Sequence, residues 1–416
     1  MERKEKPQKN YRVTARCMRW ILLVFVSQGL LILLNPWGKT AEMRQTSGVT
    51  ATSVTSKRKE AESSANKPRL NVIILTHMSS GSTFLGNVFN LHPDVFYLFE
   101  PLNELRMIVY GDGKNLGEWN VLDEKAEEAY RTDFSNLLRD FVTCSFIRDN
   151  TIDYLFPLRV KRWEHFQAWR STDTKFTKES IREVCNSRKI TVAKIMQTRL
   201  PGEIGIRELQ RVCSSEPHKY ECLIIHFVRD PRAVILSLIT RGFHMPFGPM
   251  RKLITTKNTP RDGKEMIRHN SDILCSEVEV NLNYVNEEWS KWFKGRYVLA
   301  RYEDTPANLL KAVLFMYNFT GLPMVTSISK WIREGIRPPG VTINSPTYNG
   351  NSFKKNDVRI EHWRLHLDNI QVSEFEEGCW PMMHMMGYIS INANERLLHD
   401  TSQKLWTDEI PFPFPR

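Results

Sequence analysis

The sequence LNVIILTHMSSGSTFLGNVFN, from Leu70 to Asn90, decides the fold of this chain. It begins with a short run of aliphatic and β-branched residues, 72–75, which is typical of a strand buried on both faces of a parallel sheet. Small and hydroxyl-bearing residues follow at 79–83, and apolar residues then recur at helical spacing from 84 to 91. The pattern predicts a strand, a tight loop and a helix.

The loop at 79–83 has the chemistry of an anion site. Unpaired backbone N–H groups at the positive end of a helix dipole attract phosphate or sulfate, and the hydroxyl groups add further donors. An ordinary Ser-rich turn before a core helix is the alternative. The Walker A nucleotide motif does not fit, because Asn87 and Val88 occupy the positions of its Lys and Ser/Thr. A hydrolase nucleophile elbow is excluded as well, since no Gly-x-Ser-x-Gly occurs.

A basic segment and an apolar segment precede this region. Seven Lys/Arg against Glu2 and Glu5 give residues 1–19 a net charge of +5, out of +11 for the whole chain. The apolar segment that follows favours an uncleaved signal-anchor with its basic side in the cytoplasm, and a cleaved signal peptide is the alternative. We therefore expect a cytoplasmic tail (1–19), a transmembrane signal-anchor (20–37), a flexible luminal stem (38–68), a globular domain (69–392) and a C-terminal tail (393–416).

The cysteines fit a luminal domain. Cys17 falls on the cytoplasmic side, and the other six form up to three disulfides in an oxidising compartment, in a pairing that the sequence does not reveal. Clustered Cys/His spacing of the zinc-binding kind is absent from the sequence. The sequon Asn318-Phe319-Thr320 agrees with a secretory route.

Strand and helix patterns alternate through the globular domain. Apolar runs predict strands at 95–99, 191–196, 223–228 and 297–302, and helical spacing predicts helices at 123–141, 285–293 and 306–319. This alternation indicates an α/β fold with a doubly wound, mostly parallel sheet. The basic, aromatic stretch 145–189 is interpreted as a solvated surface, with a substrate-gripping lid as the alternative.

Glu100 directly follows the strand predicted at 95–99. Open α/β sheets bind their ligands at the carboxyl ends of the strands, so Glu100 is a candidate general base. A salt-bridged or helix-capping glutamate is the alternative.

Arg229 follows the strand predicted at 223–228, and Ser237 lies about two turns into the next helix. Asp230 and Pro231 are favoured at the N-cap and first turn, so the switch from strand to helix is well specified. An Arg fork with a nearby hydroxyl can bind a phosphate. The alternative is a structural ion pair between Arg229 and Asp230 or another neighbour.

Taken together, four segments resemble the Golgi carbohydrate sulfotransferases, specifically the galactose/N-acetylglucosamine/N-acetylgalactosamine 6-O-sulfotransferase group. They occur in the family's order, cover most of 70–391, and read SSGSTFLGNVFNLHPDVFYLFEP, IIHFVRDPRAVILS, YEDTPANLLKAVLFMYNFTGLP and SFKKNDVRIEHWR. The resemblance implies a P-loop-like sulfotransferase fold for 69–392. It also implies transfer of sulfate from 3′-phosphoadenosine 5′-phosphosulfate to the 6-hydroxyl of a hexose or N-acetylhexosamine in a glycan or proteoglycan chain. The location implied is the Golgi membrane, as a single-pass type II glycoprotein with a luminal catalytic domain.

The same resemblance assigns roles to the residues already singled out. The loop residues Ser80, Gly81, Ser82, Thr83 and Phe84 would hold the 5′-phosphosulfate of the donor. Arg229 and Ser237 would hold its 3′-phosphate, and Glu100 would be the base. The expected partners are a glycan or glycosaminoglycan acceptor and a membrane, without nucleic acid and without a metal. A homodimer is left open.

Ser79 departs from the family pattern, which has Arg, or Lys in cytosolic relatives, at this position beside the donor. The chain therefore lacks a cation that would neutralise the bridging oxygen of the donor. Candidates to replace it are His77, Arg106 and lysines of the basic stretch 145–189. A donor- or glycan-binding pseudoenzyme is the alternative function, and a nucleotide kinase is disfavoured by the missing Walker lysine.

Overall fold

A five-stranded sheet forms the centre of the protein. The computed structural model describes residues 67–102, 105, 124–148, 177–240, 263–307, 309–334 and 360–411. The strands lie in the order β2-β3-β1-β4-β5 and every neighbouring pair is parallel. Their bounds are Arg69–Thr76 (β1), Val95–Phe99 (β2), Ile190–Met196 (β3), Tyr220–Val228 (β4) and Tyr297–Arg301 (β5). The prediction of an α/β fold with a doubly wound, mostly parallel sheet is confirmed.

Helices connect the strands and follow the last one. Those up to residue 240 are α2 (Ser82–Asn90), α4 (Glu124–Thr143), α7 (Lys178–Asn186), α8 (Gly205–Cys213) and α9 (Pro231–Thr240). The later ones are α10 (Gly263–Glu287), α11 (Asp304–Ala307), α12 (Leu309–Thr320), α13 (Thr326–Glu334), α15 (Asn369–Met386) and α16 (Glu395–His399). Short 3₁₀ turns at Gln197–Arg199 and His362–Leu365 and a π-helical turn at Trp289–Phe293 complete the described elements.

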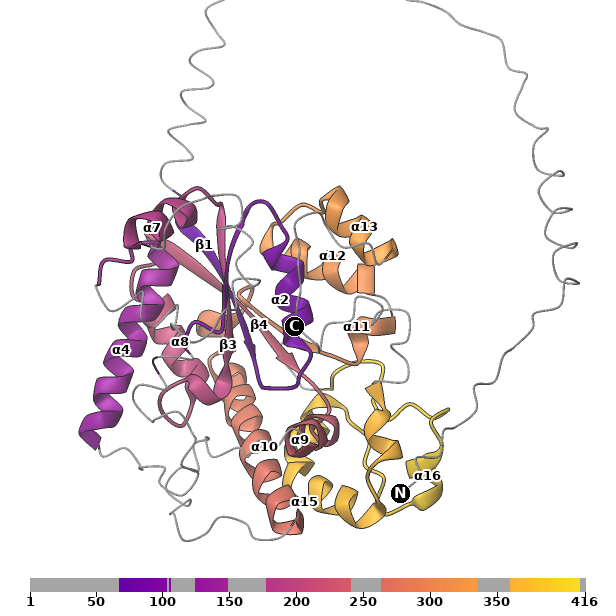
Figure 1. Ribbon diagram of the computed structural model, residues 1–416. Helices are drawn as coiled ribbons and strands as arrows, with labels where there is room; N and C mark the ends of the chain where they lie inside the picture. The colour runs from indigo at the N-terminus through magenta and orange to yellow at the C-terminus, as the bar shows by residue number, and fades with distance from the viewer. Residues whose placement is uncertain are drawn as a thin grey trace, which may run out of the picture. The chain divides into compact units, whose positions relative to one another are not determined.

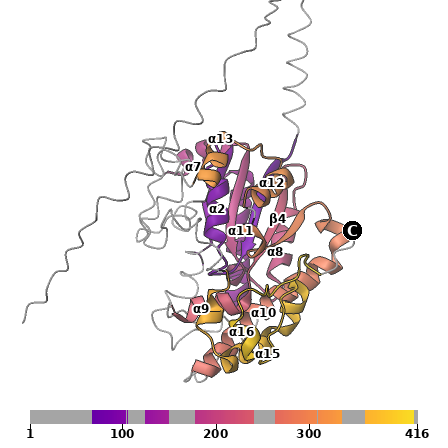
Figure 2. The same ribbon diagram turned by 90° about the vertical axis from the view of Figure 1, so that its right-hand side faces the viewer.

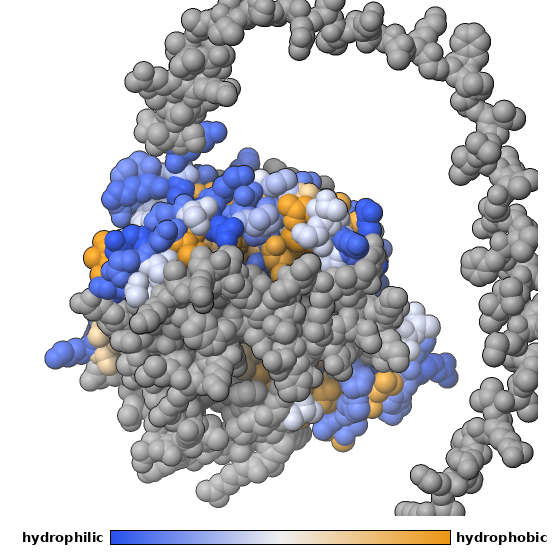
Figure 3. All heavy atoms as spheres, turned by 45° about the horizontal axis from the view of Figure 1, so that its top comes forward, coloured by the Kyte–Doolittle hydropathy of each residue, from blue (hydrophilic) through white to orange (hydrophobic). Residues whose placement is uncertain are grey.

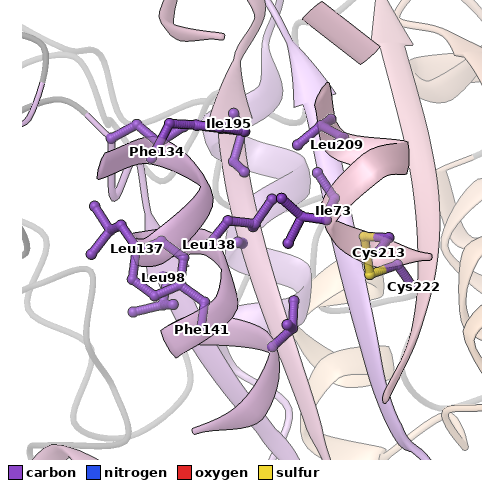
Figure 4. Packing of buried hydrophobic residues seen from close by; sticks show 14 of the residues in the cluster. Ile73, Leu98, Phe134, Leu137, Leu138, Phe141, Ile195, Leu209, Cys213 and Cys222 are labelled. Atoms are coloured by element: carbon purple, nitrogen blue, oxygen red, sulfur yellow. A yellow bond between two sulfur atoms is a disulfide. The ribbon is translucent and has the colours of Figure 1, made fainter. Parts of the chain in front are cut away.

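Both faces of the sheet are buried, as the apolar run of β1 predicts. Val72 and Ile74 pack in a cluster with α2, α12 and α13, whereas Ile73 and Leu75 pack in a cluster with α4, α7 and α8. The two sets of helices lie on opposite sides of the strands in Figure 1, and Figure 2 shows α2, α12 and α13 from the side. Figure 4 shows side chains of α4 against Ile73 of β1. Alternating residues of one strand therefore serve two separate cores.

A third apolar cluster joins α9, α10 and α15 to the end of the chain. These helices lie together below the sheet in Figure 1. The segment 393–411, which we expected as a tail, contributes Leu398 and Leu405 to this cluster, and both side chains are buried. Arg364 holds the segment in place by donating to the carbonyl oxygens of Leu397, Leu398, Asp400 and Gln403.

All six predicted luminal cysteines are paired. The disulfides are Cys144–Cys185, Cys213–Cys222 and Cys275–Cys379. The first joins the end of α4 to α7, the second joins α8 to β4 (Figure 4), and the third joins α10 to α15.

The face in Figure 3 carries hydrophilic residues with hydrophobic ones between them, over the part that the structure describes. Scattered apolar residues of this kind are normal for a soluble domain surface. None of the described helices is both long and apolar enough to cross a membrane. The predicted tail and anchor (1–37) lie outside the described residues, as does the predicted stem up to residue 66.

Candidate active site

The loop after β1 and the loop after β4 meet at Ser79. β1 and β4 are parallel neighbours from Arg69 and Tyr220 to Thr76 and Phe227, so their carboxyl ends lie side by side. Arg229 Nη1 donates to the Ser79 carbonyl oxygen at 2.9 Å, and Ser237 Oγ donates to Ser79 Oγ at 3.1 Å. The structure thus brings together the loop and the Arg/Ser pair that we assigned to two ends of one donor.

The loop has a backbone shape that only some residues adopt easily. Gly81, the N-cap of α2, has φ of 83°, and a Cβ on it would lie 2.4 Å from the ring of Tyr302. Ser79 is also left-handed, at φ of 61°, a conformation found for few residues other than glycine. Strained backbone of this kind gathers at functional sites. Here it turns the chain so that α2 begins at Ser82 with its N-terminus at the loop.

The remaining loop residues fall into two groups. Ser80 is fully buried and its hydroxyl pairs with Thr76 Oγ1 at 2.7 Å, so it supports the loop from beneath. Thr83 and Phe84 lie in the first turn of α2 and are half-buried. Phe84 packs against Trp331 of α13 at 5.6 Å between ring centroids. A helix N-terminus that presents backbone donors and Thr83 in this way is suited to an anion.

Arg229 is held by this loop and not by Asp230. Its guanidinium stacks over the Tyr302 ring at 4.5 Å from the centroid, in addition to its bond to Ser79. Asp230 instead pairs with Arg232, at 2.8 Å between Oδ2 and Nη2, and accepts from the backbone N–H of Arg232 at the start of α9. Asp230 is therefore the ion-pair partner of Arg232, and its predicted N-cap role is confirmed.

Glu100 lies in a buried cluster with two cations. Its Oε1 accepts from Lys194 Nζ at 2.9 Å and its Oε2 accepts from Arg199 Nη1 at 2.7 Å. Burial would raise the pKa of the Glu100 carboxyl, but Lys194 and Arg199 together hold that pKa well below its usual range. Glu100 is thus ionised and salt-bridged at the carboxyl end of β2, and with φ of 49° it is left-handed like Ser79 and Gly81. The salt-bridged glutamate offered as the alternative is what the structure contains, and the role of Glu100 as general base stays a prediction.

Lys194 is the residue that sequence reasoning missed. It lies in β3 with 1% exposure, and its ammonium group contacts Thr83 Oγ1 at 3.2 Å and the Phe99 ring at 4.2 Å from the centroid. It therefore links the first turn of α2 to Glu100. A signal was available, because a lysine inside an apolar strand is costly to bury unless an anion pairs with it. What the sequence lacks is the strand register, which places Lys194 opposite Phe99.

His77 does not supply the cation that Ser79 lacks. Its side chain is fully buried, and burial, with Arg229 nearby, lowers its pKa to about 4. His226, in the adjacent strand, is also buried, and its pKa is lowered to about 3 by burial and by His77. Both rings are therefore neutral near neutral pH. Arg106 lies outside the described residues, and so does most of the basic stretch 145–189, whose described part is 145–148 and 177–189.

Across the residues that the structure describes, no group of three or more His, Cys, Asp or Glu side chains is arranged to hold a metal ion. The charged groups gathered here are Arg229, Lys194, Arg199 and Glu100, an arrangement suited to anion binding and proton transfer.

Comparison with known proteins shows similarity to sulfotransferases. Residues 210–387 match the family model described as a sulfotransferase domain. Carbohydrate sulfotransferase 1 of Danio rerio is 26% identical over 83% of this chain and 84% of its own length. Carbohydrate sulfotransferase 3 of Mus musculus is 25% identical over 79% of this chain and 71% of its own length. Residues 210–387 thus match a sulfotransferase domain, and the chain as a whole is similar to carbohydrate sulfotransferases.

The sulfotransferase-domain match contains Arg229 and Ser237 but begins after Ser79 and Glu100. The alignments with whole relatives extend over most of the chain. Among solved structures, the sulfotransferase domain from the Synechococcus PCC 7002 olefin synthase is similar at 15% identity, with a TM-score of 0.36 and coverage of 75% of this chain and 95% of that domain.

Proposed function

We propose that this protein transfers sulfate from 3′-phosphoadenosine 5′-phosphosulfate to the 6-hydroxyl of a hexose or N-acetylhexosamine in a glycan or proteoglycan chain. The observation that carries the proposal is the meeting of Ser79 with Arg229 and Ser237, which are 150 and 158 residues away in sequence. One anion site at a helix N-terminus and one Arg/hydroxyl site then lie close enough to hold two anionic ends of a single donor.

The donor's two ends would bind as follows. The first turn of α2, with Ser82 and Thr83, faces the 5′-phosphosulfate and stabilises it with backbone donors and the positive end of the helix dipole. Arg229 and Ser237 bind the 3′-phosphate, for which a guanidinium fork and a hydroxyl are well suited. Tyr302 keeps the guanidinium in place by stacking beneath it.

Transfer then needs a base and a positively charged surrounding for the leaving phosphate. The oxygen of the acceptor hydroxyl forms a bond to sulfur while the bond from sulfur to the 5′-phosphate oxygen breaks, and adenosine 3′,5′-bisphosphate leaves. The hydroxyl proton passes to a carboxylate, for which we propose Glu100. Holding donor and acceptor in line supplies much of the remaining rate enhancement.

The test is transfer of labelled sulfate from the donor to a panel of glycans. Turnover on a 6-hydroxyl acceptor, located by mass spectrometry of the product, is the expected result. A pseudoenzyme is the second candidate, because Ser79 lacks the family's cation. It would be favoured over the enzyme if adenosine 3′,5′-bisphosphate bound normally and no acceptor were sulfated under conditions in which a relative is active.

We also propose that the domain acts in the Golgi lumen, behind the type II anchor predicted at 20–37. The pairing of all six cysteines of the domain supports an oxidising compartment. Protease protection of the intact domain in sealed Golgi vesicles would support this location, and digestion without detergent would contradict it. The homodimer stays a prediction.

A further inference from the structure

The missing cation at Ser79 needs a replacement if the protein is an enzyme. The donor's leaving phosphate gains negative charge as the bond to sulfur breaks, and a preorganised positive group at that point is worth several kcal/mol, or about 10²- to 10³-fold in rate. Ser79 cannot provide it, since its hydroxyl accepts from Ser237 and its carbonyl oxygen accepts from Arg229. The neutral His77 cannot provide it either.

Of the cations described at this site, Lys194 is the one that reaches the first turn of α2. Its Nζ lies 3.2 Å from Thr83 Oγ1 and 2.9 Å from Glu100 Oε1. Arg199 contacts the other oxygen of the same carboxylate, and Arg229 is placed on the β4 side of the loop. Lys194 therefore lies between the proposed base and the proposed binding position of the 5′-phosphosulfate.

Glu100 has two cationic partners, because Lys194 contacts one oxygen of its carboxylate and Arg199 contacts the other. Arg199 alone is sufficient to keep Glu100 paired if Lys194 turns toward the donor, since its bond to Oε2 is independent of Lys194.

We propose that Lys194 is the catalytic cation of the transfer, exchanging its bond to Glu100 for one to the leaving phosphate oxygen as the reaction proceeds. This inference rests on the proposed function. As the acceptor oxygen bonds to sulfur, the hydroxyl proton moves to Glu100 and neutralises its charge, so the salt bridge to Lys194 weakens. The ammonium then donates to the bridging oxygen, which leaves with the electron pair of the broken bond to sulfur. Nothing is oxidised or reduced in this step.

The exchange explains how a carboxylate of low pKa can serve as the base. With both cations in place Glu100 is a weak proton acceptor, because its ionised form is strongly stabilised. When Lys194 turns toward the donor, one of the two stabilising charges leaves the carboxylate and its proton affinity rises. Proton transfer to Glu100 and the movement of Lys194 toward the donor therefore favour each other in the same step.

The experiment compares Lys194→Met, Lys194→Gln and Lys194→Arg with wild type in sulfate transfer and in calorimetric binding of adenosine 3′,5′-bisphosphate. We expect kcat to fall about 10²- to 10³-fold in the Met and Gln variants, with bisphosphate affinity within about threefold of wild type. The Arg variant should recover part of the rate. Lys189→Met is the matched control. Lys189 directly precedes β3, the strand that contains Lys194, but its side chain is exposed and forms an ion pair with Asp94.

The outcomes separate the inference from the proposed function. Full turnover by Lys194→Met, or full recovery by the uncharged Lys194→Gln, would overturn the role of Lys194 while leaving the enzyme established. Absence of turnover in the wild type itself would overturn the proposed function, and this inference with it. The Met variant keeps Glu100 paired with Arg199, so folding is expected, and an unchanged melting temperature checks it. If Lys194→Met does unfold, the Gln variant, which retains hydrogen-bond donors, carries the test.

Discussion

Arg229 is the residue with the most specific placement in the site. It bonds to the loop after β1, stacks on Tyr302 and lies at the end of β4. Arg229→Ala removes a charge-assisted bond to the proposed 3′-phosphate, and we expect the Kd for adenosine 3′,5′-bisphosphate to rise about 10- to 100-fold. Isothermal titration calorimetry measures this change. An affinity unchanged from wild type would show that the phosphate binds elsewhere.

Substitution of Glu100 is expected to lower turnover and to leave bisphosphate binding nearly unchanged. Glu100→Gln keeps the shape of the side chain but removes the proton acceptor, so transfer should fall by about 10² to 10⁴, while bisphosphate binding stays close to wild type. The measurement is kcat beside the calorimetric Kd. Turnover near the wild-type value would exclude Glu100 as the base, and a large loss of binding would indicate that its role is to hold Lys194 and Arg199.

These residues show what a sequence reveals of such a site. Glu100 and Arg229 were found because each directly follows an apolar run that predicts a buried strand, and ligands of open sheets bind at that edge. Lys194 was not found, because its partners Thr83 and Glu100 are 111 and 94 residues away and depend on the strand order β2-β3-β1. Arg229 and Ser79 meet because β4 lies next to β1 in the same sheet. Contacts between strands need a register that the sequence does not state.

At the scale of elements, the strands were predictable and many helices were not. The run at 95–99 coincides with β2, and the runs at 191–196 and 297–302 match β3 and β5 to within one residue. The run at 223–228 covers the last six residues of β4. The helix predicted at 285–293 is instead the end of α10 followed by the π-helical turn, and that at 306–319 is divided between α11 and α12. The helix α15 gave little signal, because Gly378 and Pro381 interrupt its pattern.

Gly378 has a packing reason that only the structure shows. A Cβ at this position would lie 2.5 Å from Asp272 Oδ1 of α10, so the glycine permits close approach of α10 and α15. The disulfide Cys275–Cys379 lies at the same contact. The two helices are therefore joined both covalently and by packing.

The disulfides should differ in their effect on stability. Cys275–Cys379 closes a separation of 104 residues and Cys213–Cys222 one of 9, and a longer closed loop restricts the unfolded chain more. We expect Cys275→Ser/Cys379→Ser to lower the free energy of unfolding by about 4 kcal/mol and Cys213→Ser/Cys222→Ser by about 2 kcal/mol. Chemical denaturation of the two double variants measures the difference. Equal losses would contradict the loop-length explanation.

For the molecule as a whole, stability should depend on pH through Glu303. Burial and the neighbouring Asp230 raise the pKa of this carboxyl to about 7 from an ordinary 4.5, while Tyr388 donates to it at 2.8 Å. Below pH 4.5 both the folded and unfolded states are protonated, so Glu303 costs nothing. As pH rises toward 7 the unfolded state alone loses its proton, and the fold loses on the order of 3 kcal/mol.

Glu303→Gln removes this dependence. We expect its melting temperature relative to wild type to increase steadily between pH 5 and about 7.5 and then to level off. The comparison is made against wild type at each pH, because His77 and His226, with lowered pKa values, make both proteins less stable as pH falls below 6.5. A constant difference between the two proteins over this range would show that Glu303 is ionised in the folded state throughout.

The three disulfides also decide how the protein should be produced. Their six sulfur atoms belong to side chains that are almost fully buried, and they link α4 to α7, α8 to β4 and α10 to α15. A bacterial cytoplasm keeps such thiols reduced. Recombinant material from that source would start with three links missing, and its inactivity would imitate a pseudoenzyme. The protein should therefore be secreted from a eukaryotic host, and its free thiols should be counted before each assay. Under these conditions, absence of sulfate transfer would be evidence for a pseudoenzyme.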